Sequence, residues 1–332
     1  MRCFKFFCIL CVSSTMLARE KEQLPQSSQS YRMQPQEKRF TPWYTGALLT
    51  SGAHTLSAGK YEIQPILFIR NTSATSNEHS RSKNTPNITT VQPAVTFQMG
   101  WLSWLDFAIT MQCLYKHQSD KHAFHVGDTS LKWGVQLMKE EDNYPAIQIA
   151  LTESIPTGKY EKLNPSKKGI DATGSGSYVT KFSFNIAKLF RFFPSHPLSC
   201  KASFNYAIPT SIHVRGFNAY GGGIGTKGWV KAGHLMAIYT AVELSLTQQW
   251  AFACDLAYTY QGRSTFSGNK GYAFTNQTAS VGTPSNGSLS SALSIEYSQS
   301  DHLGFLAGIW FPIIKHNSPN FISYAFTMSY SW

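Results

Sequence analysis

The chain has 332 residues and a formal net charge of +11, yet only 14% of its residues are charged and another 14% are aromatic. Soluble domains carry about 25% charged residues. A mean hydropathy of −0.21 excludes a bundle of membrane helices, because after the N-terminus no stretch approaches the ~18 apolar residues that a spanning helix requires. Low charge with many aromatics is typical of a membrane β-barrel, whose strands alternate apolar and polar positions.

The N-terminus has the pattern of an export signal. Arg2 and Lys5 form a positive region, an apolar run follows, and residues 16–18 (MLA) form a cleavage site. Residues 1–18 are therefore predicted to be a signal peptide. The cysteines that remain after cleavage occupy apolar positions of predicted strands, as small hydrophobic side chains do, and indicate neither a disulfide framework nor a metal site: Cys113, Cys200 and Cys254.

Residues 19–59 are predicted to form an N-terminal periplasmic segment. Residues 19–40 are rich in Gln, Ser and charge without periodicity, which indicates a flexible leader. Residues 41–59 mix aromatic and aliphatic side chains with Gly and Ser, so we expect them to enter the barrel as a partial plug. The proposed plug residues are Pro42, Trp43 and Tyr44. A periplasmic linker is the alternative interpretation.

From residue 60 onward, strand-like segments alternate with turns to the C-terminus. Most reach the ~9–11 residues that a tilted strand needs to cross a bilayer. The sequence therefore predicts an all-β fold, a transmembrane antiparallel up-and-down β-barrel of about 12 strands over residues 60–332. The predicted strands span 60–70, 88–101, 103–116, 126–138, 145–155, 174–187, 198–210, 233–246, 249–262, 287–299, 302–314 and 319–332.

The closing strand shows the alternation clearly. Successive strand residues point to opposite faces, so its apolar side chains share one face: Ile322, Tyr324, Phe326, Met328, Tyr330 and Trp332. The opposite face carries only Ser, Thr and Ala, which suits a lumen. A terminal aromatic strand also resembles the recognition signal of the barrel-assembly machinery, a predicted partner. Phe326, Tyr330 and Trp332 are the predicted assembly signal.

The predicted connectors alternate in length. Every odd-numbered connector before the last is longer than its even-numbered neighbours, as expected when short turns face the periplasm and long loops face outward. A soluble β-sandwich has no reason for this alternation. Both termini then lie on the periplasmic side. The basic charge is spread over the connectors, which favours contact with outer-membrane lipid and lipopolysaccharide. Because no basic stripe with interleaved aromatics occurs, we expect no nucleic-acid partner.

Aromatic residues near predicted strand ends indicate the two interfacial girdles of a membrane barrel. They are Trp101, Trp104, Trp250, Tyr258, Tyr260, Trp310, Phe311, Tyr330 and Trp332. Trp310 also falls on the face assigned to the lumen, together with Leu114 and Leu306.

Charged residues inside predicted strands fall almost entirely on the face opposite the apolar one. A charge facing lipid near the midplane costs about 2–4 kcal/mol, so these side chains are predicted to line the lumen. They are Glu62, Asp106, Asp128, Lys132, Lys181, Lys201, Glu243, Asp255 and Glu296. Pairing across the barrel is the alternative to contact with a solute. The mixed signs argue against a simple anion- or cation-selective ring.

No motif in the chain indicates an enzyme. We find no Ser/His/Asp triad and no G-x-S-x-G motif. His122, His125 and Asp128 have a spacing that metal ligands can use, but a solvated loop is the preferred interpretation. We therefore predict no catalytic residues, no metal and no cofactor.

Several segments resemble a known family of bacterial outer-membrane proteins, the meta-pathway phenol-degradation family. They run from residue 42 onward and include PWYTG at 42–46, LLTSG at 48–52, PTGKY at 156–160, DATGSGSY at 171–178 and GFNAYGGG at 216–223, with the final aromatic strand. The resemblance implies an outer-membrane barrel that passes small, often hydrophobic or aromatic, molecules. It implies no catalytic residues, and we do not transfer the phenolic substrate.

The sequence thus favours a passive channel for small solutes in the outer membrane of a Gram-negative bacterium. The alternative is a non-transporting barrel whose outer loops bind lipopolysaccharide, a host surface or a protein partner. A membrane-embedded hydrolase is disfavoured because no triad is found.

Overall fold

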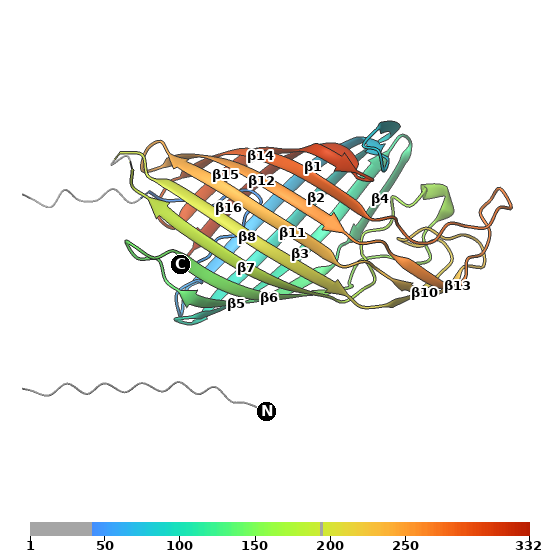
Figure 1. Cartoon of the computed structure of the whole chain (residues 1–332), viewed down its shortest axis with the longest axis horizontal. Helices are drawn as coiled ribbons and strands as arrows, with labels where there is room; N and C mark the ends of the chain where they lie inside the picture. The colour runs from blue at the N-terminus through green and yellow to red at the C-terminus, as the bar shows by residue number, and fades with distance from the viewer. Residues whose placement is uncertain (1–41, 193–194) are drawn as a thin grey trace, which may run out of the picture. The chain divides into compact units, whose positions relative to one another are not determined.

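The computed structural model describes residues 42–192 and 195–332, and these residues form a closed antiparallel β-barrel (Figure 1). Its wall consists of β1 (Tyr61–Ser76), β2 (Ser82–Leu102), β3 (Leu105–Gln118), β4 (Lys121–Val126), β5 (Thr129–Met138), β6 (Ala146–Ile155), β7 (Val179–Phe190), β8 (Leu198–Pro209), β11 (Leu235–Ser245), β12 (Trp250–Gln261), β14 (Asn286–Ser298), β15 (Leu303–His316) and β16 (Pro319–Ser331). Since β4 and β5 succeed one another along β3, the wall has 12 staves, and the predicted fold class is confirmed.

The strand order is up-and-down, because each stave pairs with its neighbours in sequence. The barrel closes between β1 and β16, with Glu62 opposite Ser331 and Ile63 opposite Tyr330. The backbones of Tyr61 and Trp332 exchange two hydrogen bonds of 3.0 Å at this seam. The C-terminal residue therefore completes the ladder that the first strand begins, which leaves no free sheet edge in the wall.

The two ends of the barrel differ in their connectors. At one end the turns are short, at 103–104, 139–145, 191–197, 246–249 and 299–302. At the other end lie the long connectors 156–178, 210–234 and 262–285. Short turns face the periplasm in outer-membrane barrels, so we call the first end periplasmic and the second end outer.

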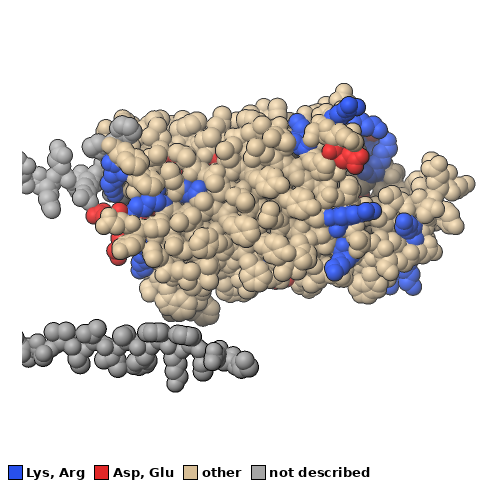
Figure 2. Space-filling view, viewed as in Figure 1, with Lys and Arg blue, Asp and Glu red and all other residues tan. Residues whose placement is uncertain are grey.

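The outer surface of the wall is apolar where it would meet lipid. On β16, the exposed side chains are Ile322, Tyr324, Phe326 and Tyr330, while Ser323 and Ala325 are fully buried on the other face. Figure 2 shows a broad central band with almost no charged residues, between two ends at which Lys, Arg, Asp and Glu gather. None of the helical segments among the described residues has the length and apolarity needed to cross a membrane.

Two features of the outer end differ from the sequence-based expectation. The predicted loop 71–87 is mostly strand, because β1 and β2 continue past the bulge between Thr72 and Ala74 as a hairpin. The two longest connectors also hold strands of their own, β9 (Ile212–Arg215), β10 (Lys227–Lys231) and β13 (Thr265–Asn269), which form a separate three-stranded sheet. Buried Ile212, Val214 and Val230 give this sheet a small core.

The girdle assignment is wrong for Trp310. Its indole donates a hydrogen bond to Ser290 Oγ (2.9 Å), and its ring meets Phe321 edge-on at 5.0 Å. Trp310 lies opposite Ser323, whose buried side chain faces the interior, so Trp310 also points inward. At the periplasmic edge, Trp332 does stack on Tyr61 and Tyr330, with ring centroids 5.8 and 5.5 Å apart.

Candidate functional site in the barrel interior

Residues 42–59, which we call the inner segment, cross the barrel interior without forming a helix or a strand. Its first half is bound by two carboxylates of the wall. Glu296 on β14 accepts the backbone N–H groups of Thr45 (2.8 Å) and Gly46 (3.1 Å) through one oxygen. Such hydrogen bonds satisfy the backbone groups of an irregular segment, which would otherwise be buried without partners.

Asp255 on β12 holds the middle of the inner segment. Its carboxylate accepts the backbone N–H groups of Leu48 (3.1 Å), Leu49 (3.3 Å) and Thr50 (2.9 Å), and also the Thr50 hydroxyl (2.7 Å). Asp255 and Thr50 are both buried. Four donors converging on one carboxylate make this the densest contact between the inner segment and the wall.

The second half of the inner segment is bound by the opposite side of the wall. Gln136 on β5 accepts the Thr55 N–H (2.7 Å) and donates to the Ala53 carbonyl (2.8 Å). Asp106 on β3 accepts the Leu56 N–H at 3.1 Å. The inner segment is therefore hydrogen-bonded from β14 across to β3, and these contacts span the lumen.

Two glycines of the wall make room for the inner segment. A Cβ atom on Gly100 would lie 2.0 Å from the Ser57 carbonyl oxygen, and one on Gly304 would lie 2.2 Å from Thr45 Oγ1. Any larger residue at either position would collide with the inner segment. Ala53 packs in a small buried cluster with Ala146 and Ala187, so the fit is also apolar in part.

The three predicted plug residues lie at the periplasmic end of the lumen. The Trp43 carbonyl accepts a hydrogen bond from Ser298 Oγ (2.9 Å), and the Tyr44 hydroxyl donates to the Pro197 carbonyl (3.1 Å). Pro42, Trp43 and Tyr44 line a cavity of about 320 Å³ there, together with Glu62 and the β14–β15 turn.

The other predicted lumen residues fall into two groups. Lys201 and Glu243 form a buried ion pair of 2.6 Å between β8 and β11, and Glu62 accepts a hydrogen bond from Ser329 Oγ (2.8 Å). Lys132 and Lys181, by contrast, flank Thr152 on the inner face and have no ion pair within residues 42–192 and 195–332.

Asp128 holds an outer loop rather than the inner segment. It lies in the break between β4 and β5 and accepts the N–H groups of Gly158 (3.0 Å) and Ser175 (2.8 Å). Tyr220, from the next long loop, donates its hydroxyl to the Ser175 carbonyl (2.9 Å). Burial, and then the charge of Asp128, raise the pKa of Tyr220 to about 12, so the phenol stays protonated and remains a donor.

A second carboxylate, Asp171, fixes the shape of the same loop. It is fully buried and accepts hydrogen bonds from the Asn164 N–H (2.9 Å) and the Lys159 ammonium (3.0 Å). Burial alone would raise the pKa of the Asp171 carboxyl, but these two donors outweigh it and hold that pKa below its ordinary value. The loop 156–178 is thus bound to the barrel and to itself.

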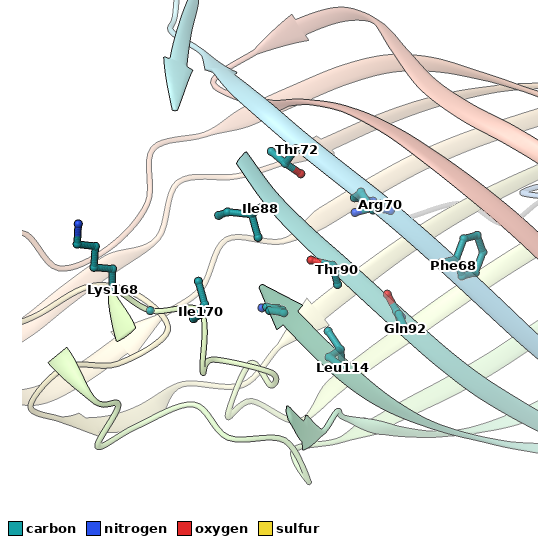
Figure 3. Close-up of a pocket in the computed structure, with 11 residues that line it drawn as sticks. Phe68, Arg70, Thr72, Ile88, Thr90, Gln92, Leu114, Lys168 and Ile170 are labelled. Atoms are coloured by element: carbon teal, nitrogen blue, oxygen red, sulfur yellow. The ribbon is translucent and has the colours of Figure 1, made fainter. Parts of the chain in front are cut away.

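A cavity of about 350 Å³ lies inside the outer half of the barrel, below this loop (Figure 3). Inward-facing residues of β1, β2 and β3 form its wall, and the loop forms its roof. Its lining consists of Phe68, Arg70, Thr72, Ile88, Thr90, Gln92, Leu114, Lys116, Lys168, Gly169 and Ile170. The lining therefore combines apolar surface with three basic residues and no acid.

Sequence reasoning missed Arg70 and Lys116, although the necessary signal was present. Each is the last residue of a predicted strand, 60–70 and 103–116, and neither was included among the predicted lumen residues. Arg70 has the same strand parity as Glu62, and Lys116 has that of Asp106. The alternation of strand faces would have placed both in the lumen.

The interior charges are sorted by sign along the barrel. Five acidic residues of the wall point inward from the periplasmic half of their strands: Glu62, Asp106, Glu243, Asp255 and Glu296. Four inward cations that have no acidic partner among the described residues lie toward the outer ends: Arg70, Lys116, Lys132 and Lys181. Lys201 and Asp128 are the two exceptions among the predicted lumen residues. Lys201 is paired with Glu243, and Asp128 is hydrogen-bonded to the loop at Gly158. The lumen is therefore not the mixed surface that the sequence indicated.

The described residues contain no group of three or more His, Cys, Asp and Glu side chains that could hold a metal ion. His122 lies opposite His117 in the β3–β4 hairpin, while Asp128 is bound to the loop at Gly158. Within the described part of the chain, Cys113, Cys200 and Cys254 are free thiols.

Comparison with known proteins gives a structural likeness only. No protein-family profile matches the chain, and no curated protein matches it. The barrel is similar to the COG4313 outer membrane channel from Pseudomonas putida F1, with a TM-score of 0.67 at 9% identity, covering 84% of this chain and 98% of that one. The toluene transporter TodX from Pseudomonas putida is a more distant barrel, with a TM-score of 0.42 at 9% identity over 88% of this chain and 95% of that one. Nothing about this chain follows from TodX.

Three observations point to the same location: the closed 12-stave wall, its apolar outer surface and the likeness to an outer-membrane barrel. The chain is a bacterial outer-membrane protein. The resemblance to the phenol-degradation family is supported only as far as an outer-membrane barrel, because no family profile matches.

Proposed function

We propose that this protein is a passive outer-membrane channel for small solutes, closed on its periplasmic side by the inner segment. The observation that carries the proposal is the mode of binding of residues 42–59. Backbone N–H groups donate to Asp106, Asp255 and Glu296, so the segment is attached by hydrogen bonds rather than by a continuous β-ladder. Hydrogen bonds of this kind can be released one by one without opening the barrel wall.

The segment and the cavity beyond it support a gated path rather than a solid core. Above the inner segment, the outer half of the lumen holds a cavity of about 350 Å³, within the range of small-molecule sites. Its apolar members, including Phe68, Ile88 and Leu114, suit the small apolar or aromatic solutes that the family resemblance implies.

Single-channel recording in planar bilayers tests the proposal. We expect the full-length protein to show small conductance steps, and a variant lacking residues 19–58 to show larger ones. A variant lacking only residues 19–40 is the matched control, since it retains residues 42–59 and their hydrogen bonds to Asp106, Asp255 and Glu296, and its steps should equal those of the full-length protein. A folded, heat-modifiable protein that conducts nothing in all three forms would contradict the channel.

A second function rests on the outer loops. The sheet of β9, β10 and β13 and its connections expose Trp229 (56%), Tyr272 (61%) and Phe274 (67%). Aromatic residues exposed in this way are typical of a binding surface, so the alternative is a barrel that binds lipopolysaccharide, a host surface or a protein partner. Replacing all three by Ser should abolish cell-surface binding while single-channel conductance is unchanged; if binding persists, the alternative fails.

A further inference from the structure

Arg70 is an unusual cation in the lumen because aromatic rings, not acids, are its neighbours. Its guanidinium carbon lies 4.7 Å from the ring centroid of Trp310 and 4.5 Å from that of Phe321. The two centroids are themselves 5.0 Å apart. These three distances form a nearly equilateral triangle, so both rings lie on the same side of the guanidinium. Arg70 also lines the cavity described above, which leaves its other side open.

The aromatic contacts hold Arg70 in place but do not neutralise it. A cation over an aromatic face is attracted only modestly, and the charge itself still lacks a counter-ion. No ion pair of Arg70 occurs within residues 42–192 and 195–332, and its Nε is buried without a hydrogen-bond partner. Burying a donor without a partner is unfavourable, so hydrogen bonding within the described residues does not explain why an arginine stands at this position.

The open side of Arg70 faces the 350 Å³ cavity shown in Figure 3. Lys116 lines the same cavity, and its ammonium donates to the Ala172 carbonyl (2.5 Å), a neutral acceptor that leaves the charge uncompensated. Lys168, at the roof, extends away from the other labelled side chains in Figure 3. The acid that neighbours Lys116 is Asp171, which is already bound to Lys159. The cavity thus has an excess of positive charge.

The other residues that line the cavity indicate which kind of anion would fit. Phe68, Ile88, Leu114 and Ile170 contribute apolar surface, while Thr72, Thr90 and Gln92 contribute hydrogen-bonding groups. A guanidinium presents a planar fork of donors that matches a carboxylate through two parallel hydrogen bonds. An inorganic anion would leave the apolar surface uncovered.

We propose that Arg70, with Lys116, forms a binding site in the outer half of the lumen for small amphipathic monocarboxylates, such as an aromatic acid. The inference rests on the proposed channel function, and it narrows the solute class from small apolar molecules in general to organic anions. Arg70 binds the carboxylate, and the apolar wall around Phe68 and Leu114 contacts the carbon skeleton.

Isothermal titration of the full-length, detergent-solubilised protein with benzoate and benzamide tests the site, because the two probes have nearly the same shape and differ in charge. We expect saturable benzoate binding and at least about tenfold weaker binding of benzamide, since one charge-assisted pair contributes roughly 1.5–3 kcal/mol. Arg70→Gln should weaken benzoate binding at least tenfold, and Arg70→Lys should fall in between. Arg81→Gln, at an exposed position of the outer hairpin, is the matched control and should bind as wild type does.

The outcomes separate this proposal from the channel itself. Equal binding of benzoate and benzamide, or full binding by a heat-modifiable Arg70→Gln protein, would overturn the site. Inorganic phosphate binding as tightly as benzoate would overturn the amphipathic ligand. Neutral-sugar swelling of proteoliposomes reports on the channel alone: swelling without benzoate binding refutes only the site, and binding without swelling refutes only the channel.

Discussion

Asp255 is the residue through which the closure of the lumen can be tested most directly. Its carboxylate receives three backbone N–H groups and one hydroxyl from residues 48–50, at 2.7–3.3 Å. Asp255→Asn keeps the size of the side chain but removes its charge. It also replaces one acceptor oxygen by an NH₂ group, which would face backbone donors that it cannot accept from.

The magnitude follows from the number and type of these hydrogen bonds. Bonds to a charged group contribute about 1.5–3 kcal/mol each, against about 0.5–1.5 for neutral ones. Since the four donors share two oxygens, their contributions do not add fully, and we take a net loss of about 3 kcal/mol. This corresponds to a shift of roughly 150-fold in the ratio of released to bound inner segment.

The assay is the open probability of single channels in planar bilayers. Asp255→Asn should raise the fraction of time spent in the larger conductance state toward that of the protein lacking residues 19–58. Asp120→Asn changes an exposed carboxylate in the turn between β3 and β4 and should behave as wild type. An unchanged open probability in a folded Asp255→Asn barrel would refute the idea that this carboxylate holds the lumen closed.

Three further predictions concern the loop, the inner segment and the seam. Because the pKa of Asp171 is depressed in the folded loop, its carboxylate stabilises residues 156–178 fully above its ordinary pKa of about 4, and this stabilisation is lost as the pH falls through the lower folded pKa. Hydrogen exchange in the loop should therefore rise in acid, and it should rise less steeply in Asp171→Asn. An equally steep rise in both proteins would show that the ion pair of Asp171 does not stabilise the loop. Gly100→Val places a side chain against the Ser57 carbonyl and should enlarge the conductance, whereas Gly287→Val on β14, whose added Cβ would meet no atom closer than 3.5 Å, should not; equal conductance in both variants would contradict the close fit. Deleting Trp332 should slow membrane assembly more than it alters conductance, and normal insertion of the truncated chain would contradict the assembly signal.

The wall of the barrel could be predicted from the sequence because the alternation of its strands depends on residues that are close together in the chain. A strand repeats every two residues, so the apolar row of β16 and the charged positions of β3 and β12 defined their own faces. Connector length then gave the orientation, since turns and loops differ at the two membrane surfaces. Predicted and observed strand ends agree to within a few residues for most staves, including 198–210 against Leu198–Pro209.

The interior could not be predicted because its contacts are distant in sequence. The Asp255 carboxylate meets Thr50 across a separation of 205 residues, and no periodicity encodes such a pair. The extra strands within the loops were missed for a similar reason. β10 pairs with β9 and β13 outside the barrel wall, where the alternation of lipid-facing and lumen-facing residues does not apply. Trp310 was misplaced in the girdle because closeness to a strand end does not say which face a side chain occupies.

The sorting of charge along the lumen leads to a last prediction about ion selectivity. Asp106, Asp255 and Glu296 are engaged by donors of the inner segment, whereas Arg70, Lys132 and Lys181 have no acidic partner among the described residues. These hydrogen bonds leave the carboxylate charges in place, but all three acidic side chains are fully buried while the inner segment is bound. The outer cations, in contrast, line the open part of the lumen, so anions should be favoured.

Removing residues 19–58 would expose those three carboxylates to the permeating ions while leaving the outer cations unchanged. The reversal potential in a KCl gradient should then move from the anion side toward the cation side, even as conductance rises. Arg70→Gln in the full-length protein should move it in the same direction without a comparable rise in conductance, because the inner segment remains bound. A truncated channel that keeps the selectivity of the full-length protein would show that the carboxylates do not face the open path, and that the inner segment closes the lumen by volume alone.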